Sequence, residues 1–339
     1  MTTLKDVAQH VGVSVQTVSN VVNGRDVVRP KTRDLILRAL EELSYHPNLA
    51  ARGLRHRRSQ TLGFLVVDPS PRYLADPFHS EVVTGIGDVA REHGYGLLIQ
   101  GTLLDEADHL PEILRPFQQK RIDGGVITLA GPPNLRRRYL DQIVSVKQPF
   151  VLLEQRISAP NTACILGENR RGAFEATEHL IHKGHRNISF LSGTIAWPAI
   201  EERMVGYQEA LQAHGYSHAQ VLMTSCDWTS QAAFDATLEL LTAHPEVTAI
   251  LGANDVLAVG ALQAVQSLGR TIPDEVALIG FDDFDFTQYV RPRLTTVRLP
   301  GYDMGRRAAE LLLEYFQTDC FPQDEVRLPT RLIIRESSQ

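Results

Sequence analysis

Cysteine is scarce in this sequence of 339 residues, and long hydrophobic runs are missing. The three cysteines, Cys164, Cys226 and Cys320, lie far apart and match no metal-binding or redox spacing, which indicates reduced thiols rather than a disulfide framework. No apolar stretch approaches the roughly 20 residues that span a bilayer. The opening residues MTTLKDVAQHVG lack the basic start and apolar run of a signal peptide. We therefore expect a cytoplasmic protein without membrane segments.

Motifs of enzyme active sites are missing as well. No GxSxG nucleophile elbow occurs, and no pair of acidic residues has a hydrolase context. Gly85, Gly87 and Ala90 match a dinucleotide-binding fingerprint in their letters. They lie inside a helical pattern well past the preceding strand, however, where no phosphate-binding loop is expected. We predict no catalytic residue and no cofactor.

Three histidines near the end of one predicted helix suggest a metal site. His179, His182 and His185 are spaced like metal ligands. His182 and His185 flank the dipeptide Lys183-Gly184, however, which is typical of a turn that ends a helix. We favour structural histidines and predict no metal here.

The net charge of −6 is divided unevenly along the chain. Residues 1–60 hold ten Lys or Arg against five Asp or Glu, a balance of +5. The remaining residues hold 24 against 35, a balance of −11. A basic segment on an acidic body indicates that only the first sixty residues meet a polyanion.

The segment LKDVAQHVGVSVQTVSNVVNG has the pattern of two short helices around a tight turn. Thr3 and Ser14 are suitable N-caps for these helices. Ala8, Gly12 and Val18 have the spacing of a helix-turn-helix motif. They supply a small residue at the helix contact, a glycine that tolerates the left-handed turn, and a side chain that fills the angle between the helices.

This packing leaves Val15, Gln16, Thr17 and Asn20 on or near the outward face of the second helix. Gln and Asn can bond bidentately to adenine, and Val can contact a thymine methyl group. Thr17 or Ser14 can instead bond a phosphate. The alternative is an ordinary helical hairpin with a polar outer face. The basic balance and the three matched positions favour sequence-specific binding to double-stranded DNA.

Two further segments complete the first sixty residues. PKTRDLILRALEELSY predicts an amphipathic third helix that begins at Pro30 and closes a small core. The core residues expected from it are Leu35, Ile36, Ala39 and Leu43.

An arginine-rich segment, NLAARGLRHRRSQ, follows Pro47. Asn48 can cap a helix over 49–55, but so short a helix does not hold in water, and Gly53 weakens it by about 1 kcal/mol relative to Ala. We expect this segment to become helical only on nucleic acid. A plain basic linker is the alternative.

The run from Leu4 to Leu54 resembles the DNA-binding head of the lactose-repressor (LacI/GalR) family. It carries KDVA, GVS, TVSxVxNG, TR and YxPNxxAR in that order, although Asn20 stands where many members have a basic residue. The resemblance implies that the second helix enters the major groove and that the hinge segment enters the minor groove. There Leu54 would be the wedge that opens a base step. It also implies contacts to DNA from Asn48, Ala51 and Arg55.

From residue 61 onward, short apolar runs alternate with helical stretches in two series. The runs are TLGFLVVD, YGLLIQG, GGVITLA and PFVLLEQ, then NISFLSG, QVLMTS, VTAILGA and EVALIGFDD. Such alternation predicts parallel sheets with helices on both faces, and two series predict two lobes. The family resemblance extends over essentially the whole chain. It implies intertwined lobes like those of periplasmic sugar-binding proteins.

Open α/β lobes bind ligands beyond the carboxyl ends of their strands. An Asp, an Asn and an Arg around an aromatic face suit a polyol, whose hydroxyls both donate and accept hydrogen bonds. The candidate effector residues at such positions are Phe78, His79, Glu154, Arg203, Trp228, Asn254 and Asp282.

The resemblance assigns roles to four of these residues. Arg203, Asn254 and Asp282 match the family's polar effector ligands, and Trp228 matches its stacking aromatic residue. His79 and Glu154 depart from the residues usual in the family. A purely structural Arg203–Asp282 pair is the alternative, and Trp197 ranks below the other candidates.

The sequence thus predicts a helix-turn-helix head over 1–46, a hinge helix and linker over 47–60, and an effector-binding and dimerisation body over 61–339. The head is all-α, and the body is periplasmic-binding-protein-like with two doubly wound parallel-sheet lobes. We expect a transcriptional regulator, most simply a repressor, that binds a pseudo-palindromic operator as a homodimer and is controlled by a sugar or related metabolite. Without the heptad tail that tetrameric members carry, the chain is expected to stop at the dimer. A solute-binding protein and a two-lobed enzyme are the alternatives, disfavoured by the basic head and the missing catalytic motifs.

Overall fold

The computed structural model describes residues 2–22, 27–43, 45, 58–68, 73–103, 110–216 and 222–339. The chain divides into two compact units, Met1–Gln60 and Thr61–Gln339. Four residues predicted to contact DNA, Asn48, Ala51, Leu54 and Arg55, lie outside the described residues, as does most of the predicted hinge. The division of the first unit into a head over 1–46 and a hinge over 47–60 therefore stays a prediction.

The first unit holds three helices, α1 (Leu4–Val11), α2 (Val15–Val22) and α3 (Pro30–Glu42). Thr3 caps α1 as predicted, because its hydroxyl accepts from the Asp6 amide while the Asp6 carboxylate accepts from the Thr3 amide. Gly12 ends α1 with φ at 73°, a left-handed conformation that glycine adopts without a steric penalty. The Ser14 hydroxyl accepts from the Thr17 amide at the start of α2. The predicted helix-turn-helix is confirmed.

The core of the first unit differs from the prediction at one position. Leu35 is 57% exposed, whereas Ile36 and Ala39 are buried and Leu40 and Leu43 pack against them. Residues 36, 39, 40 and 43 repeat at helical spacing and share one face of α3, and residue 35 lies off that face. The prediction that Leu35 belongs to the core was wrong.

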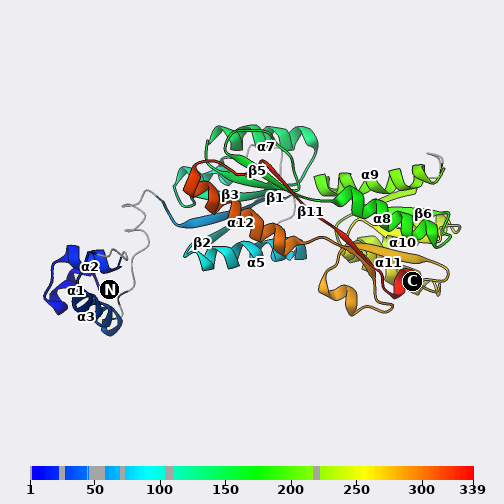
Figure 1. The fold of residues 1–339 in the computed structure, drawn as a ribbon. Helices are drawn as coiled ribbons and strands as arrows, with labels where there is room; N and C mark the ends of the chain where they lie inside the picture. Colours follow the sequence, from blue (N-terminus) through cyan, green and yellow to red (C-terminus); the bar gives the residue numbers. More distant parts are fainter. Residues whose placement is uncertain are drawn as a thin grey trace. The chain divides into compact units, whose positions relative to one another are not determined.

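Two six-stranded sheets form the second unit, one in each lobe (Figure 1). The first sheet has the order β11-β5-β4-β3-β1-β2 and the second β12-β10-β9-β8-β6-β7. All pairs are parallel except β10 with β12. The strands are β1 (Thr61–Asp68), β2 (Gly96–Leu103), β3 (Gly124–Leu129), β4 (Phe150–Leu153), β5 (Thr162–Gly167), β6 (Ile188–Gly193), β7 (Leu222–Cys226), β8 (Ala249–Gly252), β9 (Ala277–Asp282), β10 (Thr295–Arg298), β11 (Glu325–Leu328) and β12 (Arg331–Ile333).

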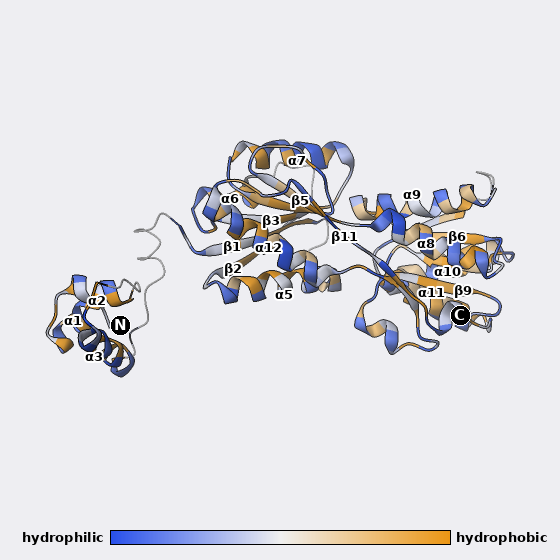
Figure 2. Cartoon of the chain, viewed as in Figure 1, coloured by the Kyte–Doolittle hydropathy of each residue, from blue (hydrophilic) through white to orange (hydrophobic). Residues whose placement is uncertain are grey.

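Helices connect and cover these strands. In lobe 1, α5 packs with α12 and α6 lies near α7; in lobe 2, α8 packs with α9 and α10 with α11. Figure 2 shows the hydrophobic residues concentrated in the strands between these helix layers. No helix among the described residues is long and apolar enough to cross a membrane. The helices are α5 (Pro77–Glu92), α6 (Leu110–Gln118), α7 (Pro133–Ser145), α8 (Asn169–His182), α9 (Pro198–Ala213), α10 (Ser230–Ala243), α11 (Asp255–Ser267) and α12 (Gly301–Thr318).

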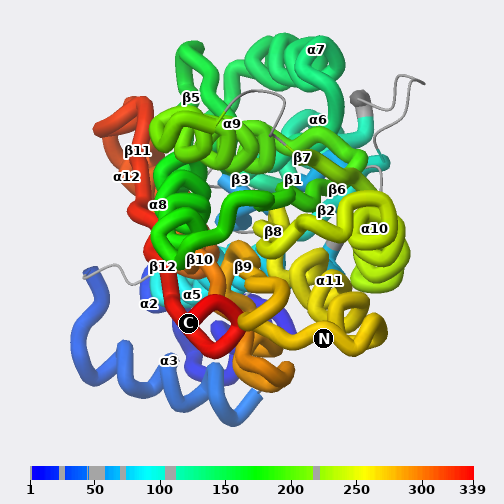
Figure 3. Tube along the Cα trace, turned by 90° about the vertical axis from the view of Figure 1, so that its right-hand side faces the viewer, coloured from blue at the N-terminus to red at the C-terminus, as the bar shows by residue number. Residues whose placement is uncertain are grey.

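The chain crosses between the lobes three times. It leaves lobe 1 between β5 and α8, returns between β10 and α12, and leaves again between β11 and β12. Figure 3 shows the two sheets running in the same order, with β11 and β12 toward the left and β2 and β7 toward the right. The predicted architecture of two intertwined, doubly wound lobes is confirmed.

Candidate functional site

The five described residues that were predicted to contact DNA lie at the start and on the first turns of α2. Ser14, Val15 and Gln16 are exposed, while Thr17 and Asn20 are half-buried. The Gln16 side-chain amide donates to Asn20 Oδ1 at 3.1 Å, and the hydroxyls of Ser14 and Thr17 lie 2.8 Å apart. Val15 leaves 44% of its surface in water although it is apolar. One exposed helix turn thus presents an apolar side chain beside two linked amides.

The candidate effector residues of lobe 2 gather at the carboxyl edge of its sheet. The neighbouring strands β9, β8 and β6 end at or near Asp282, Asn254 and Trp197, and the edge strand β7 is followed by Trp228. Because these strands are parallel, their carboxyl ends meet at one edge of the sheet. Arg203 reaches this edge from α9.

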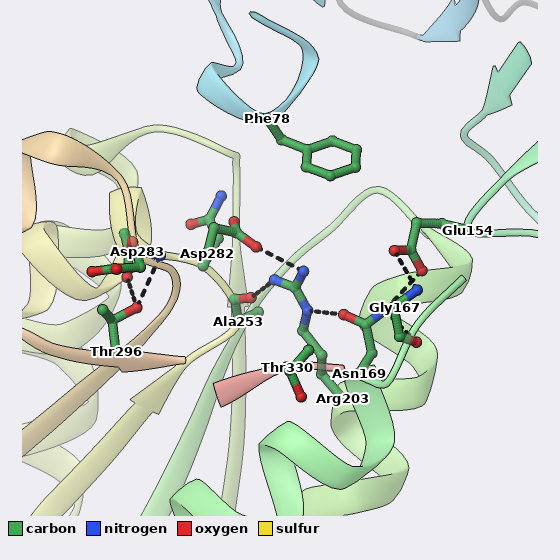
Figure 4. Close-up of polar contacts among 12 residues, drawn as sticks. Phe78, Glu154, Gly167, Asn169, Arg203, Ala253, Asp282, Asp283, Thr296 and Thr330 are labelled. Atoms are coloured by element: carbon green, nitrogen blue, oxygen red, sulfur yellow. Dashed lines mark hydrogen bonds and ion pairs between the residues drawn. The ribbon is translucent and has the colours of Figure 1, made fainter. Parts of the chain in front are cut away.

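Arg203 is the centre of the polar cluster at this edge (Figure 4). Its Nη2 donates to Asp282 Oδ1 at 2.8 Å and its Nη1 to the Ala253 carbonyl at 2.6 Å. The guanidinium lies 3.7 Å from the centre of the Phe281 ring, a cation–π contact. Arg203 and Asp282 are both more than nine-tenths buried. The structural pair that the sequence left open as an alternative is therefore present.

Asn169, which sequence reasoning missed, links the cluster to lobe 1. Arg203 Nε donates to Asn169 Oδ1 at 2.9 Å, and Asn169 Nδ2 donates to Glu154 Oε2 at 2.7 Å. Glu154 follows β4 in lobe 1, and its other oxygen accepts from the Gly167 amide at 3.0 Å. Asn169 is the first residue of α8 and stands two residues after β5, a strand that the sequence analysis did not identify. The chain of hydrogen bonds therefore runs from the edge of one sheet to the edge of the other.

A second acidic network, also missed, lies behind Asp282. Asp255 accepts from the Thr296 hydroxyl at 2.6 Å and from the Phe284 amide at 2.8 Å. Asp283 accepts from Arg298 at 2.7 Å and from Arg335 at 2.5 Å. These hydrogen bonds fix Asp283 and Phe284, which follow β9, to α11, to β10 and to Arg335 near the end of the chain.

Burial controls the protonation of the carboxyl groups in both networks. It raises the pKa of Asp282 to about 7, against the opposing charge of Arg203. Burial likewise raises the pKa of Glu154 to about 7, and it holds the pKa of Asp255 well above its ordinary value. Hydrogen-bond donors brought by a ligand would favour the ionised forms of such groups.

The backbone at three positions of the two networks is strained. Glu154, Asp282 and Asp283 have φ at 57°, 108° and 64°, a range that residues with a Cβ rarely adopt. Each such residue costs on the order of 1–3 kcal/mol, and such strain persists where surrounding contacts impose it. For Glu154 the hydrogen bonds to Gly167 and Asn169 impose this conformation, and for Asp282 the hydrogen bond to Arg203 does so.

Trp228 packs on the end of β6 but leaves its polar atom unsatisfied. A Cβ built on Gly193 would overlap the indole ring, so the two residues are in close contact. The indole Nε1 is buried and has no hydrogen-bond acceptor among the described residues. A buried N–H without an acceptor costs free energy. An acceptor supplied from outside the chain would remove that cost.

Lobe 1 faces the cluster through the first turn of α5. Figure 4 shows the Phe78 ring facing Arg203 and Asp282 across the space between the lobes. His79 points elsewhere: it is 2% exposed, and its ring centre lies 5.9 Å from those of Phe64 and Trp197. His79 and Trp197 thus join the two lobes through an aromatic contact.

Asn254 has a structural partner at the same edge. Its side-chain oxygen accepts from the Leu257 amide at 2.9 Å and caps α11. The cap fixes the oxygen, so the Nδ2 group is the part of this side chain that can donate to a ligand.

A groove of about 970 Å³ runs along α8 and α9. Among the candidate effector residues it is lined by Glu154 alone. At its border Arg136 of α7 donates to both carboxylate oxygens of Glu201 on α9, at 3.1 and 3.0 Å, and so ties lobe 1 to lobe 2. The groove shares Glu154, Gly167 and Asn169 with the chain of hydrogen bonds that leads to Arg203.

Comparisons with known proteins agree with this architecture. Residues 3–48 match the model of bacterial regulatory proteins of the lacI family, and residues 177–338 match a periplasmic binding protein-like domain. The ribose operon repressor of Halalkalibacterium halodurans is 31% identical over 100% of this chain and 98% of its own length. The lac repressor dimer bound to operator and the anti-inducer ONPF has a TM-score of 0.87 at 26% identity, covering 99% of both chains. A transcriptional regulator CelR–cellobiose complex has a TM-score of 0.73 at 30% identity, covering 99% of this chain and 100% of that one.

Proposed function

Because this chain belongs to the LacI family of bacterial regulatory proteins, we propose that it is a homodimeric repressor that a sugar or sugar derivative controls from between the lobes of its body. Its full-length relatives are transcriptional regulators, so the chain is a DNA-binding regulator and not an enzyme. Two similar proteins support a sugar: one is named for a ribose operon and another was solved with cellobiose.

One observation carries the proposed effector site. The carboxyl edge of the lobe 2 sheet carries both the Arg203–Asp282 pair and a tryptophan, Trp228, whose buried N–H has no acceptor among the described residues, and the Phe78 ring faces the pair from lobe 1. A sugar offers hydroxyl groups that both donate and accept, and its C–H face packs on aromatic rings. Asp282 would accept from hydroxyls, whereas Asn254 Nδ2 and Trp228 Nε1 would donate to them.

The proposed DNA contacts divide between the two parts of the first unit. Gln16 and Asn20 would bond base edges in the major groove, Val15 would contact a thymine methyl group, and Ser14 and Thr17 would bond phosphates. The family pattern extends this proposal to a hinge over 47–60, with minor-groove contacts from Asn48, Ala51, Leu54 and Arg55.

The edge strands of the body support a dimer. Ile99 and Leu103 on β2 and Met223 on β7 are apolar side chains that are 38%, 50% and 43% exposed. Among the described residues each of these strands pairs on one side alone, so its other edge can meet a partner. Figure 3 shows both strands toward the same side of the body. We propose that a second copy covers this surface and brings two heads to a two-fold operator.

Control by the effector requires that the ligand-bound and ligand-free proteins differ in their affinity for the operator. A coupling free energy of about 1–3 kcal/mol changes affinity five- to hundredfold. The proposed place of action is the cytoplasm, where operator and metabolite meet.

The proposal is tested by selecting an operator from random-sequence DNA and titrating it at fixed salt with and without each member of a sugar panel. Enrichment of a pseudo-palindrome and a changed affinity with one sugar class are expected. Failure to enrich any DNA sequence contradicts a regulator. An operator affinity that no sugar changes contradicts a sugar effector.

A further inference from the structure

Three potential metal ligands converge at the end of the α8–α9 pair, away from the cluster around Arg203. One ligand atom from each of Glu178, His182 and His214 lies within 4.8 Å of the other two. Glu178 and His182 are four residues apart on α8 and so share one face of that helix. His214 directly follows α9. The close packing of α8 on α9 brings these side chains together.

His214 is oriented as a metal-binding histidine requires. Its Nδ1 lies 2.9 Å from the Ala210 carbonyl oxygen, which can only accept, so Nδ1 carries the proton. In the neutral ring, Nε2 then has a free lone pair, and it lies 3.8 Å from Glu178 Oε1. A backbone carbonyl that fixes the second ring nitrogen is the usual outer contact of a metal-bound histidine.

His182 completes the geometry. Its ring lies nearly perpendicular to that of His214, at 82°, with 5.6 Å between the ring centres. An ion pair between His214 and Glu178 would account for two of the three groups. It does not account for the exposed His182, whose ring nitrogen also faces them.

We propose that Glu178, His182 and His214 form a binding site for Zn²⁺ or a transition-metal dication of similar preference. Two imidazoles and one carboxylate are donors that suit such ions better than Mg²⁺ or Ca²⁺. Zinc bonds to nitrogen and oxygen are about 2.0–2.2 Å long, so small rotations of these side chains would bring all three ligand atoms to one ion. Water would occupy the fourth position.

The bound ion would clamp α8 to α9. Asn169 begins α8 and Arg203 lies in α9, so the ion would brace the two helices that carry part of the cluster. At 1.5 Å rise per residue, Glu178 and His214 lie roughly 13–17 Å along these helices from Asn169 and Arg203. The ion would therefore stabilise lobe 2 without contacting a ligand between the lobes. This inference does not depend on the proposed effector.

His179 and His185, the neighbours that the sequence grouped with His182, have other partners. His179 Nε2 lies 2.9 Å from the Ser338 carbonyl oxygen, and His185 Nδ1 lies 3.1 Å from the Thr248 hydroxyl. The sequence analysis considered only these three histidines and favoured a helix-ending turn at Lys183-Gly184 over a metal site. Glu178 and His214 are brought to His182 by tertiary packing.

The test is equilibrium dialysis of the untagged full-length protein against Zn²⁺, in a Cys320→Ser background that removes the one exposed thiol of the described residues. We expect one ion per chain, and at least a tenfold loss of affinity in His182→Gln and in Glu178→Gln. His244→Gln is the matched control, because His244 is a partly exposed histidine that also lies beside a carboxylate, Glu246, at 3.2 Å. Circular dichroism verifies that each variant is folded.

A second measurement separates a built site from weak surface binding. The melting temperature of the wild-type protein should rise with Zn²⁺ and return with a chelator, whereas that of His182→Gln should not respond. Absence of stoichiometric binding, or equal affinity in the wild type and both variants, overturns the proposal.

Discussion

Arg203 donates to Asp282 at 2.8 Å across the carboxyl edge of the lobe 2 sheet, and both side chains are buried. The pair joins α9 to the end of β9, where Asp282 adopts a backbone conformation that is rare outside glycine. Removing one partner would leave the other charge buried and unpaired, so the pair has a structural role. The pair shares its sheet edge with Trp228 and faces Phe78 of lobe 1, which supports a second role in holding a ligand.

The pH dependence of effector binding follows from the raised pKa of Asp282, about 7. Below that pH the carboxyl of the ligand-free body is protonated, and ligand hydroxyls that donate to it favour ionisation. Effector binding near pH 6 should therefore release protons, and affinity should rise from about pH 5 to pH 7. Calorimetry in buffers of different ionisation enthalpy measures the release, which should be smaller in Asp282→Asn. Proton uptake would contradict this assignment.

The raised pKa of Asp282 also makes the free energy of unfolding depend on pH. The ordinary pKa of the Asp282 carboxyl is 3.8, so between about pH 4 and pH 7 the folded state binds more protons than the unfolded chain. The contribution of this group to the free energy of unfolding therefore falls as pH rises through that window. The difference between the wild type and Asp282→Asn, measured by urea denaturation at pH 5 and pH 7.5, isolates it. No change in that difference between the two pH values would contradict the raised pKa.

Gly193→Ala tests the role of Trp228 without changing a polar group. The added Cβ would overlap the indole ring and displace it from the end of β6. We expect at least a tenfold loss of effector affinity by calorimetry. Gly87→Ala is the control, because its Cβ would meet only Leu97 Cδ2, at 3.9 Å. Equal effector affinity in the two variants would remove Trp228 from the site.

Gln16→Ala should weaken operator binding by about 1–3 kcal/mol and leave binding to scrambled DNA unchanged. The reason is the exposed position of Gln16 beside Asn20 on α2. Gln9→Ala, an exposed glutamine on α1, is the control. Competition binding at one salt concentration provides the comparison. An equal loss on both DNAs would make Gln16 a phosphate contact or a structural residue.

Met223→Asp should convert the dimer into a monomer, since a carboxylate on β7 would be buried against the second copy. Sedimentation velocity at micromolar concentration measures the change. Ile334→Asp is the control: Ile334 is 52% exposed and follows β12 at the opposite edge of the same sheet. A wild-type monomer, or an unchanged dimer in Met223→Asp, would rule out this surface.

Periodicity in the sequence predicted two parallel-sheet lobes from the eight apolar runs that became β1 to β4 and β6 to β9, whereas the intertwining of the lobes was implied by the family resemblance. It missed β5, β10, β11 and β12. Strands β10 to β12 are three or four residues long, and β11 and β12 have exposed or half-buried positions instead of an apolar run. Their place in a sheet comes from pairing with distant strands, which local sequence does not encode.

The candidate site was predictable to the extent that its residues follow recognised strands. Asp282 and Asn254 were found in this way, whereas Asn169 follows the overlooked β5. His79 was chosen because it lies after the first strand of lobe 1. Its side chain is buried against Phe64 and Trp197 and does not point toward Arg203 as that of Phe78 does. The direction of a side chain at the start of a helix depends on packing between the lobes. The position of His79 along the chain therefore did not determine where its side chain points.

The most direct test of effector control is a titration of the selected operator with wild type, Asp282→Asn and Asp235→Asn, each with and without saturating effector. Asp235 is an exposed residue of α10, so its variant matches the charge change outside the cluster. The effector should change the operator affinity of the wild type and of Asp235→Asn by five- to hundredfold. Asp282→Asn should bind operator and show no such change. An Asp282→Asn protein that responds like the wild type, at the same effector concentration, would contradict control through the cluster around Arg203.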